Sequence, residues 1–371
     1  MQLFSLTLLL YATSCVIIAT CTDKHGINCM IMKKSFLEDK EEIVRTKDKQ
    51  KKSGSIYDIA NRLKISPSTV SRVLNGHKTI GAEVSRDVIN VSREMHFVPR
   101  KKFRTVALVI GEMSRYEPVG YSGILSVLLA KQFKKRGLVL ELIDVADLDY
   151  LRTLSFDAVV GIVFENSIAK IQDIPNLPVF TVNYSMRECG FHNISIDHRQ
   201  GALLATECLL KNGHRKLAFI EDRESNWGSV ERLDGFKGAL EKAEIDFNQD
   251  MVFYTTKTRL FEIVDKIFRA GVTGIVNCSE DISLELPHYL QNILKKNIPD
   301  DISLITIETN PVQKYMTPPQ TIIHQPFEEM CAIIAEKVHA LIGRKNGKVF
   351  DITLESSLIE YDSVKNINSK R

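Results

Sequence analysis

A regular alternation of short apolar runs and amphipathic stretches, beginning at Thr105, constrains the fold of this chain more than any other feature of its sequence. Apolar runs at 106–110, 138–143 and 158–163 have the length of buried strands, and residues 120–136 have helical periodicity. Such alternation predicts parallel strands that are covered by the helices connecting them.

The same pattern starts again further along the chain. The second series consists of a strand at 216–220, a helix at 229–243, a strand at 273–277, a helix at 284–297 and a strand at 302–307. Two such series favour two lobes with a cleft between them. We therefore predict an α/β domain of two lobes with parallel sheets over residues 105–362, followed by a tail at 363–371.

The segment before this domain, residues 54–100, has the signals of three closely packed helices. Ser55 and Asp58 have the spacing of a capping box. Ser66 and Pro67 begin a second helix only about two residues after the first one ends, because serine suits the N-cap and proline the first helical position. A third helix is expected at about 82–95. The predicted core consists of Ile56, Ile59, Ala60, Leu63, Val70, Val73, Leu74, Val84, Val88, Val91 and Met95. This unit is a helix-turn-helix.

The net charge of +3 hides an uneven distribution of charge along the chain. Residues 33–104 contain 18 Lys and Arg against 9 Asp and Glu, a balance of +9, whereas residues 105–371 contain 30 against 36, a balance of −6. A basic front part joined to an acidic body indicates that only the front part meets a polyanion, with nucleic acid as the first candidate. Residues 33–53 are expected to be a charged linker and residues 101–104 a short basic linker.

The sequences IYDIA at 56–60 and SPSTVSRVLNG at 66–76 resemble the DNA-binding headpiece of the LacI/GalR family of bacterial repressors. The resemblance implies double-stranded DNA as a partner. The residues that would reach base edges in the major groove are Pro67, Ser68 and Arg72, of which Arg72 can contact guanine with two hydrogen bonds. The residues that would hold phosphates are Tyr57, Ser66, Thr69, Ser71, Asn75 and Thr79. The alternative is that Ser66 and Thr69 only cap the helix and that Arg72 is a solvated charge.

Two positions depart from the pattern of that family. The family usually has a glycine, which tolerates positive φ, in the turn where this chain has Lys64, so a slightly strained turn is expected. The family also follows its headpiece with a short hinge helix whose leucine enters the minor groove. Here FVPRKKFR at 97–104 runs almost directly into an apolar strand, so no hinge helix is expected.

The resemblance continues through the body in the family's order. It is carried by IDHRQGA at 196–202, GHRK at 213–216, ERLDGF at 231–236, IPDDIS at 298–303 and TPPQT at 317–321. It implies a two-lobed fold of the periplasmic-binding-protein type (type I), with a small ligand such as a sugar bound between the lobes. The residues expected at the ligand are Asp197, Trp227, Arg232, Asn277, Glu280, Asp281 and Glu308.

Alternative roles stay open for several of these residues. Arg232 could instead form an ion pair on the helix surface with Glu231 or Glu280. Trp227, the only tryptophan, could cover the core instead of stacking on a sugar. Asp197 could line the ligand site or fix the connection between the lobes. Near Glu308 the family often has paired acids, but only this one is present, which indicates a different pattern of ligand hydroxyls.

No motif in the sequence indicates catalysis. The patterns GxGxxG, P-loop, HExxH and GxSxG are all absent. The cysteines at 15, 21, 29, 189, 208, 278 and 331 include no CxxC pair, and the histidines form no cluster at metal-ligand spacing. We expect no enzymatic activity, no cofactor and no metal, and we expect the four cysteines of the body to be buried thiols.

Residues 3–19 are uncharged and largely apolar, with the length of a signal-peptide core or a short membrane span. Such a run could result from a start codon assigned upstream of Met30 or Met32, or it could be a membrane anchor or an export signal. We expect the first, with residues 1–32 as an apolar leader, because the run lacks the basic residues that precede a signal core.

These features predict a cytoplasmic, nucleoid-associated homodimer. Its two headpieces would bind a roughly palindromic operator, and a small effector would change their spacing. The competing hypothesis is an exported or membrane-anchored solute-binding protein, which only residues 3–19 support.

Overall fold

The computed structural model describes residues 54–77, 79–97, 104–111, 120–163, 166–308, 311–342 and 348–368, together with three strands near the N-terminus. The chain divides into two units, residues 1–52 and 53–371. In the first unit, β1 (Leu8–Ala12) pairs antiparallel with β2 (Cys15–Ala19), which pairs antiparallel with β3 (Cys29–Met30). No helix in the described ranges is long and apolar enough to cross a membrane. The predictions for residues 33–53 and for a missing hinge helix lie outside the described residues.

The second unit begins with the predicted helix-turn-helix, formed by α1 (Ile56–Leu63), α2 (Pro67–Leu74) and α3 (Ala82–Glu94). The hydroxyl of Ser66 accepts a hydrogen bond from the Thr69 amide at 3.1 Å, and Pro67 is the first residue of α2, as the sequence predicts. The buried core of this headpiece consists of Ile59, Ala60, Val70, Val73, Leu74, Val88, Ile89 and Val91. Ile89 was not expected there, and the predicted core residues Ile56, Leu63, Val84 and Met95 are only partly buried.

The turn between α1 and α2 confirms the expectation for Lys64, which has φ 55° and ψ 40°. A residue with a Cβ atom in this left-handed region costs about 1–2 kcal/mol more than one in the right-handed helical region. The turn is held in spite of this cost, because the amide of Ile65 donates to the carbonyl of Ala60 at 3.1 Å.

The capping box of α1 gives a first prediction. The Ser55 hydroxyl accepts from the Asp58 amide at 3.2 Å, and the Asp58 carboxylate accepts from the Ser55 amide at 2.7 Å. We expect Ser55→Ala to destabilise α1 by about 1 kcal/mol, because one amide of the first turn loses its acceptor. Hydrogen exchange of the full-length protein should show faster exchange in α1, and unchanged exchange there would contradict the assignment.

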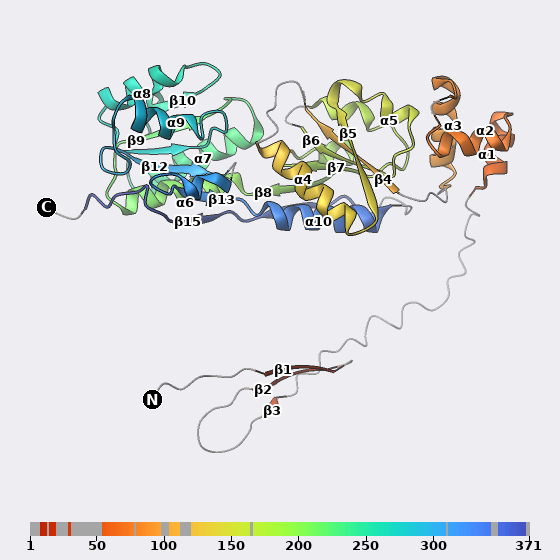
Figure 1. Cartoon of the computed structure of the whole chain (residues 1–371), viewed down its shortest axis with the longest axis horizontal. Helices are drawn as coiled ribbons and strands as arrows, with labels where there is room; N and C mark the ends of the chain where they lie inside the picture. The colour runs from red at the N-terminus through yellow and green to blue at the C-terminus, as the bar shows by residue number, and fades with distance from the viewer. Residues whose placement is uncertain are drawn as a thin grey trace. The chain divides into compact units, whose positions relative to one another are not determined.

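The first lobe is built on a six-stranded sheet in which every neighbouring pair is parallel. Its order is β14 (Asp351–Leu354), β8 (His192–Ile196), β7 (Val179–Val182), β6 (Ala158–Ile162), β4 (Arg104–Ile110) and β5 (Leu138–Asp144). The helices α4 (Tyr121–Lys134) and α10 (Phe327–Leu341) lie side by side on one face (Figure 1). The other face is covered by α5 (Tyr150–Thr153) and η3 (Asn166–Ile171).

The second lobe also has a six-stranded sheet, which is parallel except for its last strand. Its order is β10 (Val252–Tyr254), β9 (Leu217–Glu221), β11 (Gly274–Asn277), β12 (Ser303–Ile307), β13 (Thr321–His324) and the antiparallel β15 (Ser357–Ile359). One face carries α6 (His198–Lys211) and α7 (Trp227–Lys242), and the other carries α8 (Leu260–Arg269), α9 (Glu285–His288) and the π-helical η6 (Tyr289–Ile293). The helix predicted at 284–297 is thus shorter than expected and changes type midway. The remaining short 3-10 helices are η2 (Val145–Asp147), η4 (Arg187–Cys189), η5 (Gln249–Met251) and η7 (Pro311–Tyr315).

The cysteines of the body follow the prediction with one exception. Cys208, Cys278 and Cys331 are buried, whereas Cys189 is only partly buried. Burial raises the pKa of Cys208 to about 11 and that of Cys331 to about 12, so both stay protonated near neutral pH. These thiols act as small apolar side chains of the core.

The chain crosses between the lobes three times, after β8, after β13 and after β14. Both sheets are therefore completed by segments far apart in the sequence. The helix α10 packs on the first lobe, although the elements directly before it, from α6 to β13, belong to the second lobe. Because all strands of the first sheet are parallel, as are all strands of the second except β15, the carboxyl ends of the parallel strands lie along a single edge of each sheet. Polar residues that follow different strands are brought together at this edge.

Candidate functional site

The outward face of α2 carries the residues predicted to read bases. Pro67, Ser68 and Arg72 are exposed, whereas Val70 and Val73 point into the headpiece core. The set predicted to hold phosphates is also accessible. Tyr57, Ser66, Asn75 and Thr79 are exposed, and Thr69 and Ser71 are half-buried.

Hydrogen bonds join these polar side chains to one another. Arg72 donates from Nη2 to the Thr79 hydroxyl at 2.7 Å, which holds the guanidinium on the solvent side of α2. Asn75 donates to the Ser71 carbonyl at 2.8 Å. The Ser66 hydroxyl lies 2.8 Å from the Thr69 hydroxyl as well as capping α2, so its capping role is confirmed.

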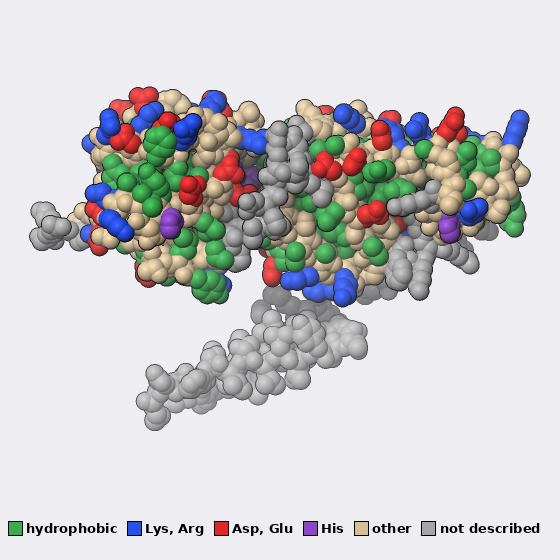
Figure 2. All heavy atoms as spheres, turned by 45° about the horizontal axis from the view of Figure 1, so that its top comes forward, with side chains coloured by type: hydrophobic (Ala, Val, Ile, Leu, Met, Phe, Trp, Pro, Cys, Tyr) green, Lys and Arg blue, Asp and Glu red, His purple; other side chains and the backbone are tan. Residues whose placement is uncertain are grey.

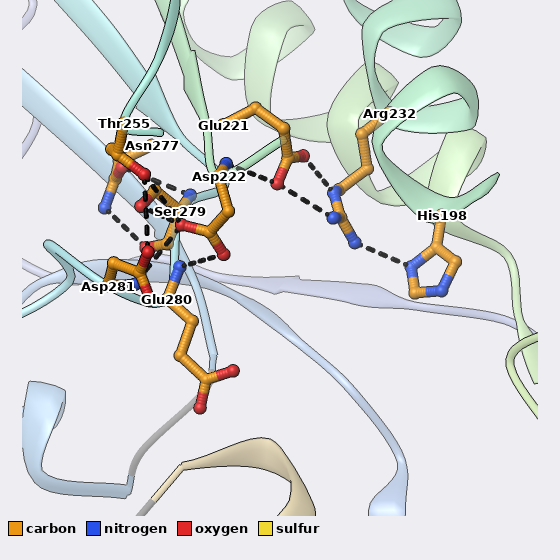
Figure 3. A network of polar contacts seen from close by, with 9 residues as sticks. All are labelled: His198, Glu221, Asp222, Arg232, Thr255, Asn277, Ser279, Glu280 and Asp281. Atoms are coloured by element: carbon orange, nitrogen blue, oxygen red, sulfur yellow. Dashed lines mark hydrogen bonds and ion pairs between the residues drawn. The ribbon is translucent and has the colours of Figure 1, made fainter. Parts of the chain in front are cut away.

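The second candidate site is a network of polar contacts at the carboxyl ends of β9 and β11 (Figure 3). Its centre is an ion pair between Arg232 of α7 and Glu221, the last residue of β9. Nε and Nη2 of the arginine lie 2.6 and 3.0 Å from the two carboxylate oxygens. The third nitrogen, Nη1, donates to Nδ1 of His198 at 3.3 Å. Glu221 is 0% exposed and the Arg232 side chain 14% exposed.

Close packing of α6 on α7 brings these side chains together. A Cβ atom at Gly235 would lie 2.0 Å from the Arg199 carbonyl oxygen of α6, so only glycine permits this approach. Arg232 is therefore held next to His198, at the start of α6. Burial works to lower the pKa of Arg232, but the attraction of Glu221 outweighs it and the pKa is raised. Burial and the nearby arginine lower the pKa of His198 well below its usual value, so this imidazole is neutral and accepts from Arg232.

Asp222, directly after Glu221, organises the turn that follows β11. Its carboxylate accepts a short hydrogen bond from the Ser279 hydroxyl and bonds from the amides of Glu280 and Asp281, at 3.1 and 3.3 Å. Asn277 is fully buried, and its amide group bonds to the backbone of Ser279 at 3.3 Å in both directions. Asn277 therefore shapes this turn.

Glu280 links the second lobe to the first. Its carboxylate accepts a hydrogen bond from the Tyr121 amide at 2.5 Å, at the N-terminus of α4. The approach is close, since a Cβ atom at Gly120 would lie 1.8 Å from Oε1 of Glu280. Burial raises the pKa of Glu280 to about 7, and Asp222 and Asp281 add to this effect, while Tyr121 and Arg232 oppose it.

Of the other predicted ligand residues, Trp227 and Asp281 lie beside this network, whereas Asp197 and Glu308 make separate contacts. Trp227 begins α7, and its ring lies edge-on to that of His198 at 5.6 Å. Asp197 caps α6 by accepting from the Gln200 amide at 2.8 Å, so it has a role at the crossing between the lobes. Asp281 is exposed, with the Thr255 hydroxyl 3.5 Å away. Glu308 forms a separate short contact with His324.

Sequence reasoning missed Glu221, Asp222, His198 and Ser279. The alternative role considered for Arg232, an ion pair with Glu231 or Glu280, names the wrong partner, because the structure pairs it with Glu221. One signal was available in the sequence: Glu221 ends an apolar strand and Asp222 follows it, just as Asn277 ends another apolar strand and Glu280 lies three residues after it. Within the described ranges, no group of three or more His, Cys, Asp or Glu is arranged to hold a metal ion.

The raised pKa of Glu280 predicts how stability depends on pH. Between about pH 4.5 and about pH 7 the folded protein holds a proton on Glu280 that the unfolded chain has released, so this residue lowers stability as the pH rises through that window. We expect Glu280→Gln to flatten this part of the profile of thermal midpoint against pH. Glu336→Gln, on the exposed face of α10, is the control and should leave the profile unchanged. Identical profiles for both variants would contradict the prediction.

Two family models match this chain. The model described as bacterial regulatory proteins, lacI family, matches residues 55–100, which include all three headpiece helices. The model described as periplasmic binding protein-like domain matches residues 206–364, which include most of the second lobe and α10.

Curated relatives match along almost their whole length. The HTH-type transcriptional regulator DegA of Bacillus subtilis is 25% identical over 79% of this chain and 91% of its own length. The HTH-type transcriptional repressor PurR of Vibrio vulnificus is 25% identical over 85% of this chain and 99% of its own. Each of these relatives is named as a regulator of transcription.

Solved structures share the fold. The complex of the transcriptional regulator CelR with cellobiose has a TM-score of 0.62 and 23% identity, and the match covers 84% of this chain and 99% of that one. A LacI-family regulator from Enterococcus faecium with bound ribose also has a TM-score of 0.62, with 18% identity over 71% of this chain and all of that one.

Proposed function

The chain belongs to the LacI family of bacterial regulatory proteins, and on this premise we propose that it is a transcriptional repressor whose affinity for an operator depends on a small effector. The observation that carries the proposal is the outward face of α2. This face exposes Pro67, Ser68 and Arg72 to solvent, on a short helix that a tight turn connects to α1. We place the protein in the cytoplasm, associated with the nucleoid, because its target is DNA.

In the proposed complex, α2 lies in the major groove. Arg72 reads a guanine, and Pro67 and Ser68 contact neighbouring base edges. The phosphates on either side are held by Tyr57, Ser66, Thr69, Ser71, Asn75 and Thr79. The Arg72–Thr79 hydrogen bond supports this assignment, because it connects a base-reading side chain with a phosphate-binding one before DNA arrives.

We propose that the protein acts as a homodimer on a palindromic operator. Large apolar side chains are exposed on both lobes, among the charged ones (Figure 2). In the first lobe they include Val127 of α4 and Val139 and Leu142 of the edge strand β5, and in the second lobe Leu284 and Tyr315. Burial between two copies is a common role for such side chains on a soluble protein.

The effector would act by changing how the lobes meet. The bond between Glu280 and the Tyr121 amide is a contact that a ligand between the lobes must keep or replace. We propose that Arg232, Trp227, Glu280 and Asp281 lie near the effector. The set expected from the sequence also contains Asp197, Asn277 and Glu308, which we propose as further residues of the effector site. Coupling of this kind is typically about 1–3 kcal/mol.

Gly120→Ala tests the contact between the lobes. The added Cβ atom would displace the Glu280 carboxylate, while the backbone, with φ −91°, accepts alanine. We expect hydrogen exchange in the first turn of α4 to become about tenfold faster, as for the loss of one hydrogen bond. Gly81→Ala is a matched control, because Gly81 also caps a helix and a Cβ atom there meets nothing within 4 Å. Equal responses in α4 to both substitutions would rule out the contact.

The proposed function is tested by selecting duplexes from a random pool with the purified full-length protein. We expect a palindromic consensus, and a Kd that weakens steeply as salt rises because phosphate contacts release counterions. Sugars added to the complex should shift that Kd. Recovery of no sequence preference would refute the proposal.

A further inference from the structure

The network of polar contacts at the carboxyl ends of β9 and β11 contains three elements that could each hold an anionic ligand. They are the guanidinium of Arg232, the backbone amides of the turn at 279–281, and the first amide of α4, at Tyr121. A phosphorylated or carboxylated effector would be expected to use at least one of them.

Each of the three elements is already occupied by a carboxylate of the chain itself. Glu221 takes Nε and Nη2 of Arg232, and His198 takes Nη1. Asp222 accepts from the amides of Glu280 and Asp281. Glu280 accepts from the Tyr121 amide. An incoming anion would have to displace a carboxylate from each element that it used.

Of these carboxylates, Glu221 is the one that an incoming anion would displace least easily. Its side chain is 0% exposed and is fixed at the end of β9, an interior strand between β10 and β11, so it cannot turn out into solvent. Asp222 and Glu280 would remain in the network and would repel a bound anion, and Asp281 adds a further, exposed carboxylate. The exposed Arg223 acts on Asp281 but touches none of the three elements through any contact that the structure describes.

We propose that the carboxylates of this network, Glu221 above all, exclude phosphorylated and carboxylated compounds from the effector site. The inference rests on the proposed function, since it concerns the effector of that regulator. Neutral hydroxyls can donate to Asp281 and Glu280 and accept from the remaining Arg232 hydrogens without displacing any carboxylate. Glu221 is a specificity-determining residue in this account, because it cancels the charge of Arg232 before any ligand arrives.

Sulfate is a suitable probe because it needs no knowledge of the true effector. Trp227 is the only tryptophan of the chain and lies against His198, so its fluorescence reports on the network and not on the headpiece. We expect sulfate to leave the Trp227 emission of the wild-type protein unchanged, relative to sodium chloride of equal ionic strength.

Glu221→Gln frees the charge of Arg232 with little change in shape. We expect this variant to bind sulfate about tenfold more tightly than the wild type, the size of effect expected from gaining a charged hydrogen bond. Glu231→Gln is the matched control, because it removes the same charge from the residue next to Arg232 and should leave sulfate affinity unchanged. If Glu221→Gln does not fold, Glu280→Ala serves in its place, because it leaves the Tyr121 amide without its acceptor.

Two results would overturn the inference. The first is a sulfate-dependent change of wild-type Trp227 emission that Arg232→Gln abolishes. The second is tighter binding of ribose 5-phosphate than of ribose to the wild type. Operator binding by the same preparations keeps this test separate from the proposed function, because sulfate binding by a protein that still selects an operator refutes only the inference about the effector.

Discussion

Replacement of Arg72 by alanine should weaken operator binding by about 1–3 kcal/mol, roughly 5- to 150-fold in Kd, while the lobes remain unaffected. The Arg72 side chain is exposed on α2 and its one described hydrogen bond is to Thr79, so its removal leaves the core residues Val70 and Val73 in place. The preference for the cognate base should be lost at a single base pair of each half-site, the one that Arg72 contacts. Fluorescence anisotropy with the selected operator and with each single-base variant would measure it.

The matched control for this prediction is Arg86→Ala. Arg86 lies exposed on α3 in the same headpiece, so its removal changes the net charge by the same amount. We expect it to reduce binding to all duplexes alike and to leave base preference intact, as for a charge acting at a distance. If Arg72→Ala also lowered affinity uniformly, with no change of preference at any position, Arg72 would not be a base-reading residue.

Replacement of Arg232 by glutamine should destabilise the two-lobed body by about 3–5 kcal/mol near neutral pH, because it leaves the Glu221 carboxylate buried without its partner. Burial already raises the pKa of Glu221, and Arg232 opposes that rise. Without the arginine this pKa rises further, so the carboxyl becomes protonated, and tolerates burial, at a higher pH. The loss of stability should therefore be smaller at about pH 5 than at about pH 8.

Arg199→Gln is the control for the buried pair. Arg199 also forms an ion pair, with Asp234, but both side chains are more than half exposed. Exposed pairs contribute little, because water and salt screen them, so the thermal midpoint should hardly change at any pH. A similar small response to Arg232→Gln would show that the interaction with Glu221 does not stabilise the body.

Much of the headpiece could be predicted from local chemistry alone. Ser55 with Asp58, and Ser66 with Pro67, are signals that act within one helical turn, and the structure confirms each of them. Lys64 in the left-handed conformation follows from the same short turn. The alternating apolar runs likewise predicted six strands of the two lobes to within a few residues, namely β4, β5, β6, β9, β11 and β12, because a strand buried on both faces must be apolar throughout. The strands β7, β8, β10, β13, β14 and β15 were not predicted.

The partners within the candidate site could not be predicted in this way. Arg232 lies next to Glu231 in the sequence, yet its partner is Glu221, at the end of a strand on which α7 packs. Glu280 meets an amide 159 residues away, at Tyr121. Such pairs depend on which strands are neighbours in a sheet and on where two helices can approach, as at Gly235 against α6.

By itself the sequence determined the three helices of the headpiece and six strands of the two lobes, and it identified the residue types that α2 presents to solvent. Capping, turn conformation and apolar periodicity act between residues a few positions apart, so they can be read along the chain. Only the tertiary structure decided which carboxylate cancels the charge of Arg232 and which one reaches the other lobe. Electrostatic attraction acts through space, and the distances between strand ends are set by sheet order and not by separation along the chain.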